Sequence, residues 1–282
     1  MKKLVAALFV ACLGSAAFAY GPLLPWSPVK PGYAMTPFAR AEVFFGQTAS
    51  LLDDYREIDA IMTEAEAFHR LRFQRPVRVI ACKNWGDCER GLPWLRVHSL
   101  GGVTLATGDV IYITPKLAEM RFSTREFLRH ELSHALLHQN TTLFKAYRIG
   151  QSSPWLTEGL AVSFGRQRDY FSREQFLEMA ARVDLAGYLD PAHPAAPWNA
   201  RFAYPTQRYF IEYLKRQHGE DAFAAYLRQA IAAPDRTVAL FGESFHSPMA
   251  NAIDAYQSEV RSGAWPPAEE PLSCSPPRII RC

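Results

Sequence analysis

The segment RHELSHALLHQ, residues 129–139, constrains this chain more than any other, because it contains three of the eight histidines. Ser123 and Glu126 precede it in the order Ser-Thr-Arg-Glu, the capping-box pattern that begins an α-helix. We therefore predict a helix over residues 124–139. The helix also has the apolar side chains it needs to bury one face, namely Phe127, Leu128, Leu132, Leu136 and Leu137.

Three side chains of this helix match the spacing of a zinc site. His130 and His134 are four residues apart, so their side-chain bases lie about 5–6 Å apart on one face, where two imidazoles can bind one tetrahedral Zn²⁺. Glu131 is turned about 100° from His130, which places its carboxylate beside the metal as a general base. The alternative is a solvated polar helix face. Half-buried histidines without a metal would need other partners.

A catalytic zinc also needs a third protein ligand and one open position. His138 is two turns from His130, about 12 Å along the helix axis, which is too far for both to bind one ion. Glu158, in SPWLTEGLAVSFG, is the second candidate, and Gly159 beside it allows close helix packing. Taken alone, Glu158 is better explained as a solvated glutamate in the first turn of a helix.

HELSH followed by WLTEGLA resembles the gluzincin zinc peptidases of the peptidase-MA-like kind, over roughly residues 105–165. The resemblance implies a zincin-like fold. It implies His130, His134 and Glu158 as the Zn²⁺ ligands and Glu131 as the general base. It also implies peptide or protein substrates.

The same resemblance implies a tyrosine that stabilises the oxyanion of the reaction. Tyr204 has the expected placement in FAYPTQRYFIEYLKRQHG, with Tyr209 as the alternative, and both residues could instead simply pack. The resemblance further implies that the strand over 109–114 lies at the edge of the sheet. There, its free backbone groups could pair with an extended peptide.

Strand patterns before the motif and helix patterns after it predict an α+β fold, with a small N-terminal sheet, the motif helix and a mostly helical C-terminal lobe. Strands are expected over 76–82, with Val77, Val79 and Ala81 on one face, and over 109–114. Further helices are expected over 50–70, 156–167, 173–184, 206–217 and 221–232, with Ser50 and Ser172 as caps. The proline-rich residues 20–38 predict an irregular lead-in.

The N-terminus has the pattern of an export signal. Lys2 and Lys3 precede an apolar run over 4–13, and Ala17-Phe18-Ala19 predicts cleavage after Ala19. The run is too short to span a bilayer, which takes about 20 residues, and we expect no membrane span elsewhere. The alternative is acylation at Cys12. The expected organisation is a signal peptide over 1–19, one metallopeptidase domain over 20–265 whose sheet-containing lobe ends near 140, and a tail over 266–282.

The remaining cysteines predict disulfides, which agrees with export to the periplasm or beyond. The two close couples suggest Cys82–Cys88 and Cys274–Cys282, and neither has the tight spacing of a zinc knuckle. Net charge is +3, with 31 basic and 28 acidic residues. The sequence therefore lacks the excess of positive charge that is typical of nucleic-acid-binding proteins.

These patterns favour an exported zinc-dependent peptidase that acts on peptide or protein substrates. A second interpretation is a zinc-containing binding or assembly module of the cell envelope without turnover. The presence of Glu131 argues against it, because binding alone needs no general base. A third is a zinc hydrolase of a non-peptide amide. Neither the cleavage preference nor the oligomeric state follows from the sequence.

Overall fold

The computed structural model describes residues 24–46 without 28 and 29, 54–119 without 94, 97 and 99, 123–166, 173–190, 193 and 199–266, together with positions 12 and 14. The predicted signal peptide, apart from positions 12 and 14, falls outside these residues. So do the predicted helix caps Ser50 and Ser172 and the predicted disulfide Cys274–Cys282.

Within the part of the chain that the structure describes, five strands form one mixed sheet in the order β1-β2-β3-β5-β4. They are β1 (Ala34–Pro37), β2 (Ala41–Phe45), β3 (Val77–Ala81), β4 (Gly102–Thr104) and β5 (Val110–Ile113). The three inner strands are parallel to one another, and β1 and β4 run antiparallel to their neighbours at the two edges. The strands predicted over 76–82 and 109–114 are confirmed as β3 and β5.

Two expectations about the strands are wrong. The strand over 109–114 is not at the edge, because β5 pairs with β3 on one side and with β4 on the other, which makes β4 the edge strand. Part of the expected irregular lead-in forms β1. Pro37 is tolerated there because it ends an edge strand, where a missing backbone N–H costs no ladder hydrogen bond.

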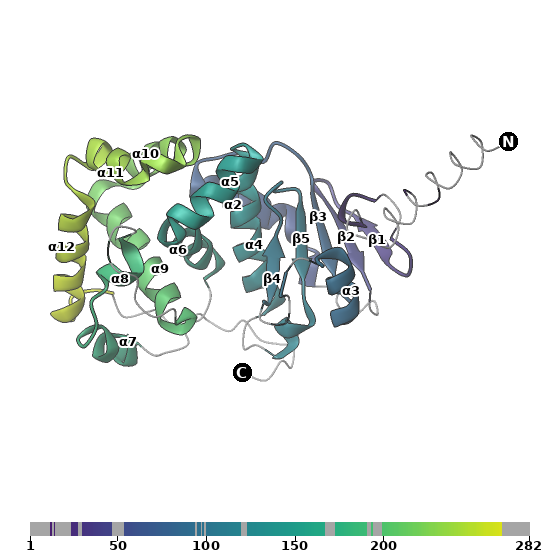
Figure 1. Cartoon of the computed structure of the whole chain (residues 1–282), viewed down its shortest axis with the longest axis horizontal. Coiled ribbons are helices and arrows are strands. Elements are labelled where there is room, and N and C mark those ends of the chain that lie inside the picture. Colours follow the sequence, from purple (N-terminus) through teal and green to yellow (C-terminus); the bar gives the residue numbers. More distant parts are fainter. Residues whose placement is uncertain are drawn as a thin grey trace.

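Helices make up most of the described regular structure; the first two lie between strands along the chain and the others follow the last strand, so the fold is mixed α+β. They are α2 (Ile58–His69), α3 (Trp85–Gly91), α4 (Thr124–Gln139), α5 (Leu143–Ser152), α6 (Pro154–Gly165), α7 (Arg173–Ala180), α8 (Ala186–Leu189), α9 (Ala200–His218), α10 (Glu220–Ala232), α11 (Thr237–Phe245) and α12 (Met249–Arg261). Short 3₁₀ turns are η1 (Leu24–Trp26), η4 (Pro115–Glu119) and η5 (Pro234–Arg236). Figure 1 shows the sheet at one end, α7 to α12 at the other, and α4 and α6 between them.

The predicted helices are found with shifted ends. The motif helix has the predicted bounds, whereas the helix predicted over 50–70 begins only at Ile58. The helix predicted over 206–217 begins six residues earlier at Ala200, because Pro205 lies inside the first turns of α9 rather than ahead of the helix. None of the described helices combines the length and hydropathy that crossing a bilayer requires.

The two faces of the sheet pack against different partners. Val77, Val79 and Ala81 share one face, as predicted, and join the large core that includes buried residues of α2, α4, α6 and α9. Ile80 and Tyr112 point to the other face and join a smaller cluster with Cys88 of α3. The inner strands are therefore covered on both faces, as parallel strands usually are.

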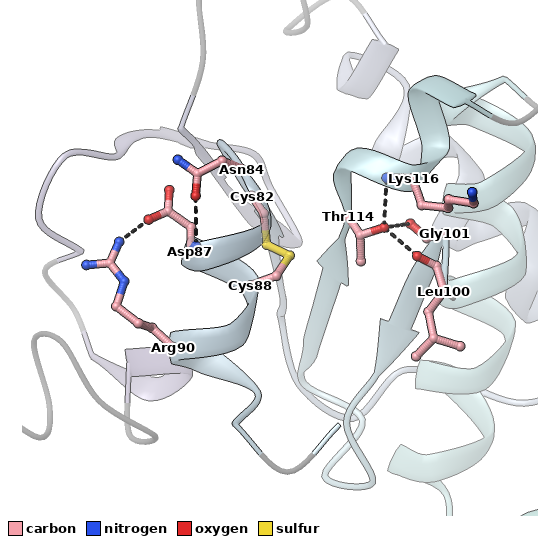
Figure 2. The surroundings of a disulfide bond; sticks show 9 residues. All are labelled: Cys82, Asn84, Asp87, Cys88, Arg90, Leu100, Gly101, Thr114 and Lys116. Carbon is pink, nitrogen blue, oxygen red and sulfur yellow. Dashed lines mark hydrogen bonds and ion pairs between the residues drawn. A yellow bond between two sulfur atoms is a disulfide. The ribbon is translucent and has the colours of Figure 1, made fainter. Parts of the chain in front are cut away.

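The small helix α3 is fastened to the sheet by the predicted disulfide Cys82–Cys88, which is confirmed (Figure 2). Asn84 caps the helix by accepting a hydrogen bond from the Asp87 backbone N–H at 3.0 Å. On the neighbouring strand, the Thr114 hydroxyl donates to the Leu100 carbonyl oxygen (Figure 2). That bond ties the segment before β4 to the end of β5 and so helps to place the edge strand.

Candidate metal centre

Helix α4 holds the two histidines of the motif on a rigid, buried element. The predicted capping box is present: Glu126 N–H donates to Ser123 Oγ at 3.1 Å, and Ser123 N–H donates to the Glu126 carboxylate at 2.6 Å. Leu128, Leu132 and Leu136 are fully buried and anchor the helix in the large core. The imidazoles therefore project from a fixed backbone.

His130 and His134 lie close enough to share one ion. Their Nε2 atoms are 3.1 Å apart, and His130 itself is only 6% exposed. Glu158, on α6, approaches both: its Oε2 is 3.5 Å from His130 Nε2 and its Oε1 is 3.5 Å from His134 Nε2. The sequence-predicted ligands are thus brought together, with candidate ligand atoms that all lie within 4.8 Å of one another.

Glu158 is placed by the packing of α6 between α4 and α9. Pro154 begins α6, and Trp155 packs its ring against Phe210 of α9 with centroids 5.5 Å apart. A Cβ at Gly159 would lie 2.7 Å from the Gln207 carbonyl oxygen, so only glycine permits this close approach of α6 and α9. The expected role of Gly159 in helix packing is confirmed.

The charges of the cluster are mutually dependent. Burial by itself would raise the pKa of Glu158, but the neighbouring imidazoles, His134 above all, lower it to about 2. Burial opposes protonation of His134, yet the Glu158 carboxylate raises the pKa of this imidazole. The pair therefore favours an ionised carboxylate beside a positive charge, which a bound cation can supply in place of a proton.

The donor set suits zinc. Two imidazole nitrogens and one carboxylate oxygen form a common zinc ligand set, and bonds of 2.0–2.1 Å in a tetrahedron put neighbouring ligand atoms about 3.3–3.4 Å apart. The two imidazole nitrogens are 3.1 Å apart, and each lies 3.5 Å from a different oxygen of the Glu158 carboxylate, so the carboxylate faces both rings. Glu158 Oε2 is also buried without a hydrogen-bond donor, as expected of an atom whose natural partner is an ion.

Glu131 lies beside this cluster and not in it. Its side chain is 4% exposed and accepts a hydrogen bond from the Thr104 hydroxyl of β4, with Oγ1 2.7 Å from Oε2. Burial raises the pKa of Glu131 to about 7, against the opposing effects of His134 and Thr104. The carboxyl is therefore positioned next to the candidate ligands with its affinity for a proton enhanced.

The third histidine of the motif has another partner, in agreement with the distance argument against its being a ligand. His138 Nδ1 lies 3.1 Å from the Leu105 carbonyl oxygen, to which it can only donate. Burial lowers the pKa of His138 to about 4, so the ring is neutral at physiological pH. His138 thus links α4 to the segment that follows β4.

The two candidate tyrosines occupy different surroundings. The Tyr204 ring on α9 lies 6.2 Å from the His130 ring, centroid to centroid. Tyr209 is only 2% exposed, and its ring lies 5.1 Å from that of Phe176 in the large core. Tyr204 is therefore the tyrosine beside the cluster, whereas Tyr209 packs in the interior.

Sequence reasoning missed two features around the centre. Gly102 and Thr104 of β4 contact Glu131, although no pattern in the sequence around them indicates this contact. His69 on α2 was not singled out either. Its Nδ1 donates to the Ala65 carbonyl oxygen at 2.8 Å and its Nε2 accepts from the Ser133 hydroxyl at 2.7 Å, which fastens α2 to the back of α4.

Comparison with known proteins gives only distant structural likenesses. No protein-family model and no curated protein matches this chain. Among solved structures it is similar to a two-domain M1 zinc metallopeptidase variant bound to L-arginine (15% identity, TM-score 0.47). It is also similar to an M1 zinc metallopeptidase from Deinococcus radiodurans (17% identity, TM-score 0.45). The matches cover 85% of this chain and 54% of each of those chains, so this chain spans about half their length. Similarity at this level is too slight to assign an activity.

Proposed function

We propose that this protein is a zinc-dependent peptidase of the gluzincin type. One observation carries the proposal: His130, His134 and Glu158 converge from two helices with separations suited to one tetrahedral ion. Glu131 stands beside them as an additional carboxyl. A site that only bound metal would need the first three residues but not the fourth, so the arrangement favours hydrolysis over binding alone.

In this proposal each side chain has a distinct task. His130, His134 and Glu158 hold the zinc, which when bound acts as a Lewis acid that polarises a carbonyl and makes water more acidic. Glu131 accepts the proton of the attacking water and delivers it to the leaving amine. The Tyr204 hydroxyl donates a hydrogen bond to the oxygen on which negative charge develops.

The remaining sequence-based expectations belong to the same proposal. We infer export to the periplasm or beyond, with cleavage after Ala19, and an organisation into a sheet-containing lobe up to about residue 140 and a helical lobe after it. The disulfide Cys82–Cys88 supports export, because such bonds persist mainly in oxidising compartments. The substrates are peptides or proteins.

The first test combines metal analysis with digestion of a broad peptide library by the purified protein. We expect about one zinc ion per chain and cleavage that a chelator abolishes and added zinc restores. Glu131→Gln should keep the zinc and lose about 10²–10⁴-fold in rate, the usual contribution of a general base. Glu158→Ala should lose the zinc itself. Glu178→Gln, at an exposed glutamate of α7, is the matched control and should change neither.

The outcomes separate the candidate functions. Full activity in Glu131→Gln would reject the mechanism. Zinc binding without cleavage of any library peptide would favour a binding or assembly module of the cell envelope. Turnover of a non-peptide amide in place of peptides would identify a different zinc hydrolase.

A further inference from the structure

The edge strand β4 lies along α4 beside Glu131, and the hydroxyl of its Thr104 contacts that residue twice. The Thr104 hydroxyl oxygen is 2.7 Å from Glu131 Oε2 and 2.9 Å from the Glu131 carbonyl oxygen. A hydroxyl has one proton, so its hydrogen bond is shared between these two acceptors. The side chain and the backbone of Glu131 are thereby tied to one point on the strand.

Gly102 contacts the same carboxylate from the other end of β4. A Cβ at this position would lie 2.8 Å from Glu131 Oε1, closer than real Cβ atoms approach, and 3.0 Å from Cγ. The glycine therefore lets the strand backbone lie against the carboxylate. Between Thr104 and Gly102 the Glu131 side chain has little freedom left, although a free glutamate samples many rotamers.

The strand that carries Thr104 is itself anchored to α4. His138 bonds the Leu105 carbonyl oxygen, and Gln139 Nε2 donates to the Gly108 carbonyl oxygen at 2.8 Å. These two bonds fix the turn that follows β4 onto the last turns of the motif helix. Thr104 is thus held on a rigid frame, as a group that orients another side chain must be.

We infer that Thr104 is a positioning residue for Glu131. The inference rests on the proposed function. By engaging Oε2, the Thr104 hydroxyl holds the carboxylate in one orientation, with Oε1 against Gly102, and so fixes the direction from which it takes up the proton of the attacking water. A misplacement of about 1 Å in such a group can cost about 10²-fold in rate, so the hydroxyl matters for turnover and little for substrate affinity.

The kinetic test compares Thr104→Val, which removes the hydroxyl at nearly constant shape, with Thr104→Ser, which keeps it. Thr141→Val is the control: Thr141 donates to the Ile231 carbonyl oxygen at 2.8 Å beyond the end of α4, away from Glu131. We expect Thr104→Val to lower kcat about tenfold or more with KM within about twofold, Thr104→Ser to recover most of kcat, and Thr141→Val to match the parent. Zinc content should be equal in all four proteins. A kcat of Thr104→Val within about twofold of the parent would overturn the inference.

A second measurement does not depend on catalysis. Urea unfolding midpoints of the metal-free protein are compared for the parent, Thr104→Val, Glu131→Ala and the double variant. If the two residues interact, the shifts of the single variants will not add in the double variant, whereas additive shifts would contradict the contact. Absence of chelator-sensitive cleavage in the parent would defeat the proposed function, and this cycle would still decide whether Thr104 holds Glu131.

Discussion

The two faces of the sheet are covered in different ways. One face packs against α2 and α4 in a core that continues into α6, α9 and α10. The other packs against α3 through a much smaller cluster that includes both cysteines of the disulfide. All members of the candidate metal centre lie on α4, α6 and their neighbours, on the side of the large core. The small side contributes none of them.

The helices on the two faces of the sheet are held in place by different means. A large apolar core can hold α4 and α6 in place by burial alone, and it fixes the side chains that these helices carry. A seven-residue helix buries too little apolar surface to stay docked in the same way, and a covalent link restricts it instead. Changes that displace α4 or α6 should therefore disturb function, and changes around α3 should affect stability alone.

Tyr204→Phe should show the largest effect among the variants that test this comparison. Removal of one donor to a developing oxyanion typically lowers kcat about 10²–10³-fold, and the ring that packs beside His130 is retained. Tyr209→Phe is the matched control on the same helix and should leave kcat nearly unchanged. Steady-state kinetics with a peptide identified from the library provides the measurement, and equal kcat values for the two variants would contradict the role of Tyr204.

Gly159→Ala tests whether the large core sets the position of Glu158. The new methyl group would meet the Gln207 backbone and the Ile211 side chain at 2.7–2.8 Å, so α6 and α9 must separate. We expect the free energy of unfolding to fall by up to about 3 kcal/mol and zinc affinity to fall with it.

Gly150→Ala on α5 is the control for this substitution, because nothing lies within 4 Å of the position its Cβ would take. It should stabilise the helix by about 0.5–1 kcal/mol. Chemical denaturation and competition with a zinc chelator measure the two quantities. Normal zinc affinity in a destabilised Gly159→Ala protein would show that the packing of α6 against α9 does not set the position of Glu158.

Removal of the disulfide tests the face of the sheet that α3 covers. The Cys82→Ala/Cys88→Ala double variant frees a short loop, and chain entropy predicts a loss of about 2–3 kcal/mol in the free energy of unfolding. Zinc stoichiometry and kcat should not change, because no residue of the candidate centre lies on this side. Thermal unfolding, metal analysis and kinetics on one preparation measure the stability, the zinc stoichiometry and kcat. Loss of zinc in this variant would mean that the two sides are coupled.

Features with local signals could be predicted from the sequence, and features that depend on distant segments could not. The start of the motif helix was predictable because its signal is local: Ser123 and Glu126 form the capping box within one turn. His130 and His134 were predicted to approach because a helix fixes side chains four residues apart. Glu158 depended on the resemblance to gluzincins, because nothing local distinguishes a ligand from a solvated glutamate in a first helical turn.

The missed parts depend on contacts between distant segments. The order of the strands was not predictable, so β5 was placed at the edge that β4 occupies. Thr104 lies 27 residues from Glu131, and a threonine in a short strand carries no sign of the residue it faces. His69 and Ser133 are 64 residues apart and meet only after α2 packs behind α4. Such contacts are determined by tertiary packing, which the periodicity of a sequence does not describe.

The smallest effect is expected from His69, which lies in the large core and should make the free energy of unfolding depend on pH. Burial, assisted by Lys215 and His134, lowers the pKa of His69 in the folded state to about 3, against about 6.5 in the unfolded chain. Below pH 6.5 the unfolded state therefore binds more protons, so stability falls as pH falls. From pH 7 to pH 5 this histidine should remove about 2 kcal/mol from the free energy of unfolding.

His69→Asn isolates that contribution, because an amide keeps a donor near the Ala65 carbonyl oxygen and does not titrate. Carboxylates such as Glu66, whose pKa is lowered by its partners Arg40 and Arg72 despite burial, also weaken the fold in acid, and they do so in both proteins. The difference between the two pH profiles of the metal-free proteins then belongs to His69. A variant whose stability falls as steeply as the parent's between pH 7 and pH 5 would show that this imidazole accepts a proton without leaving the core.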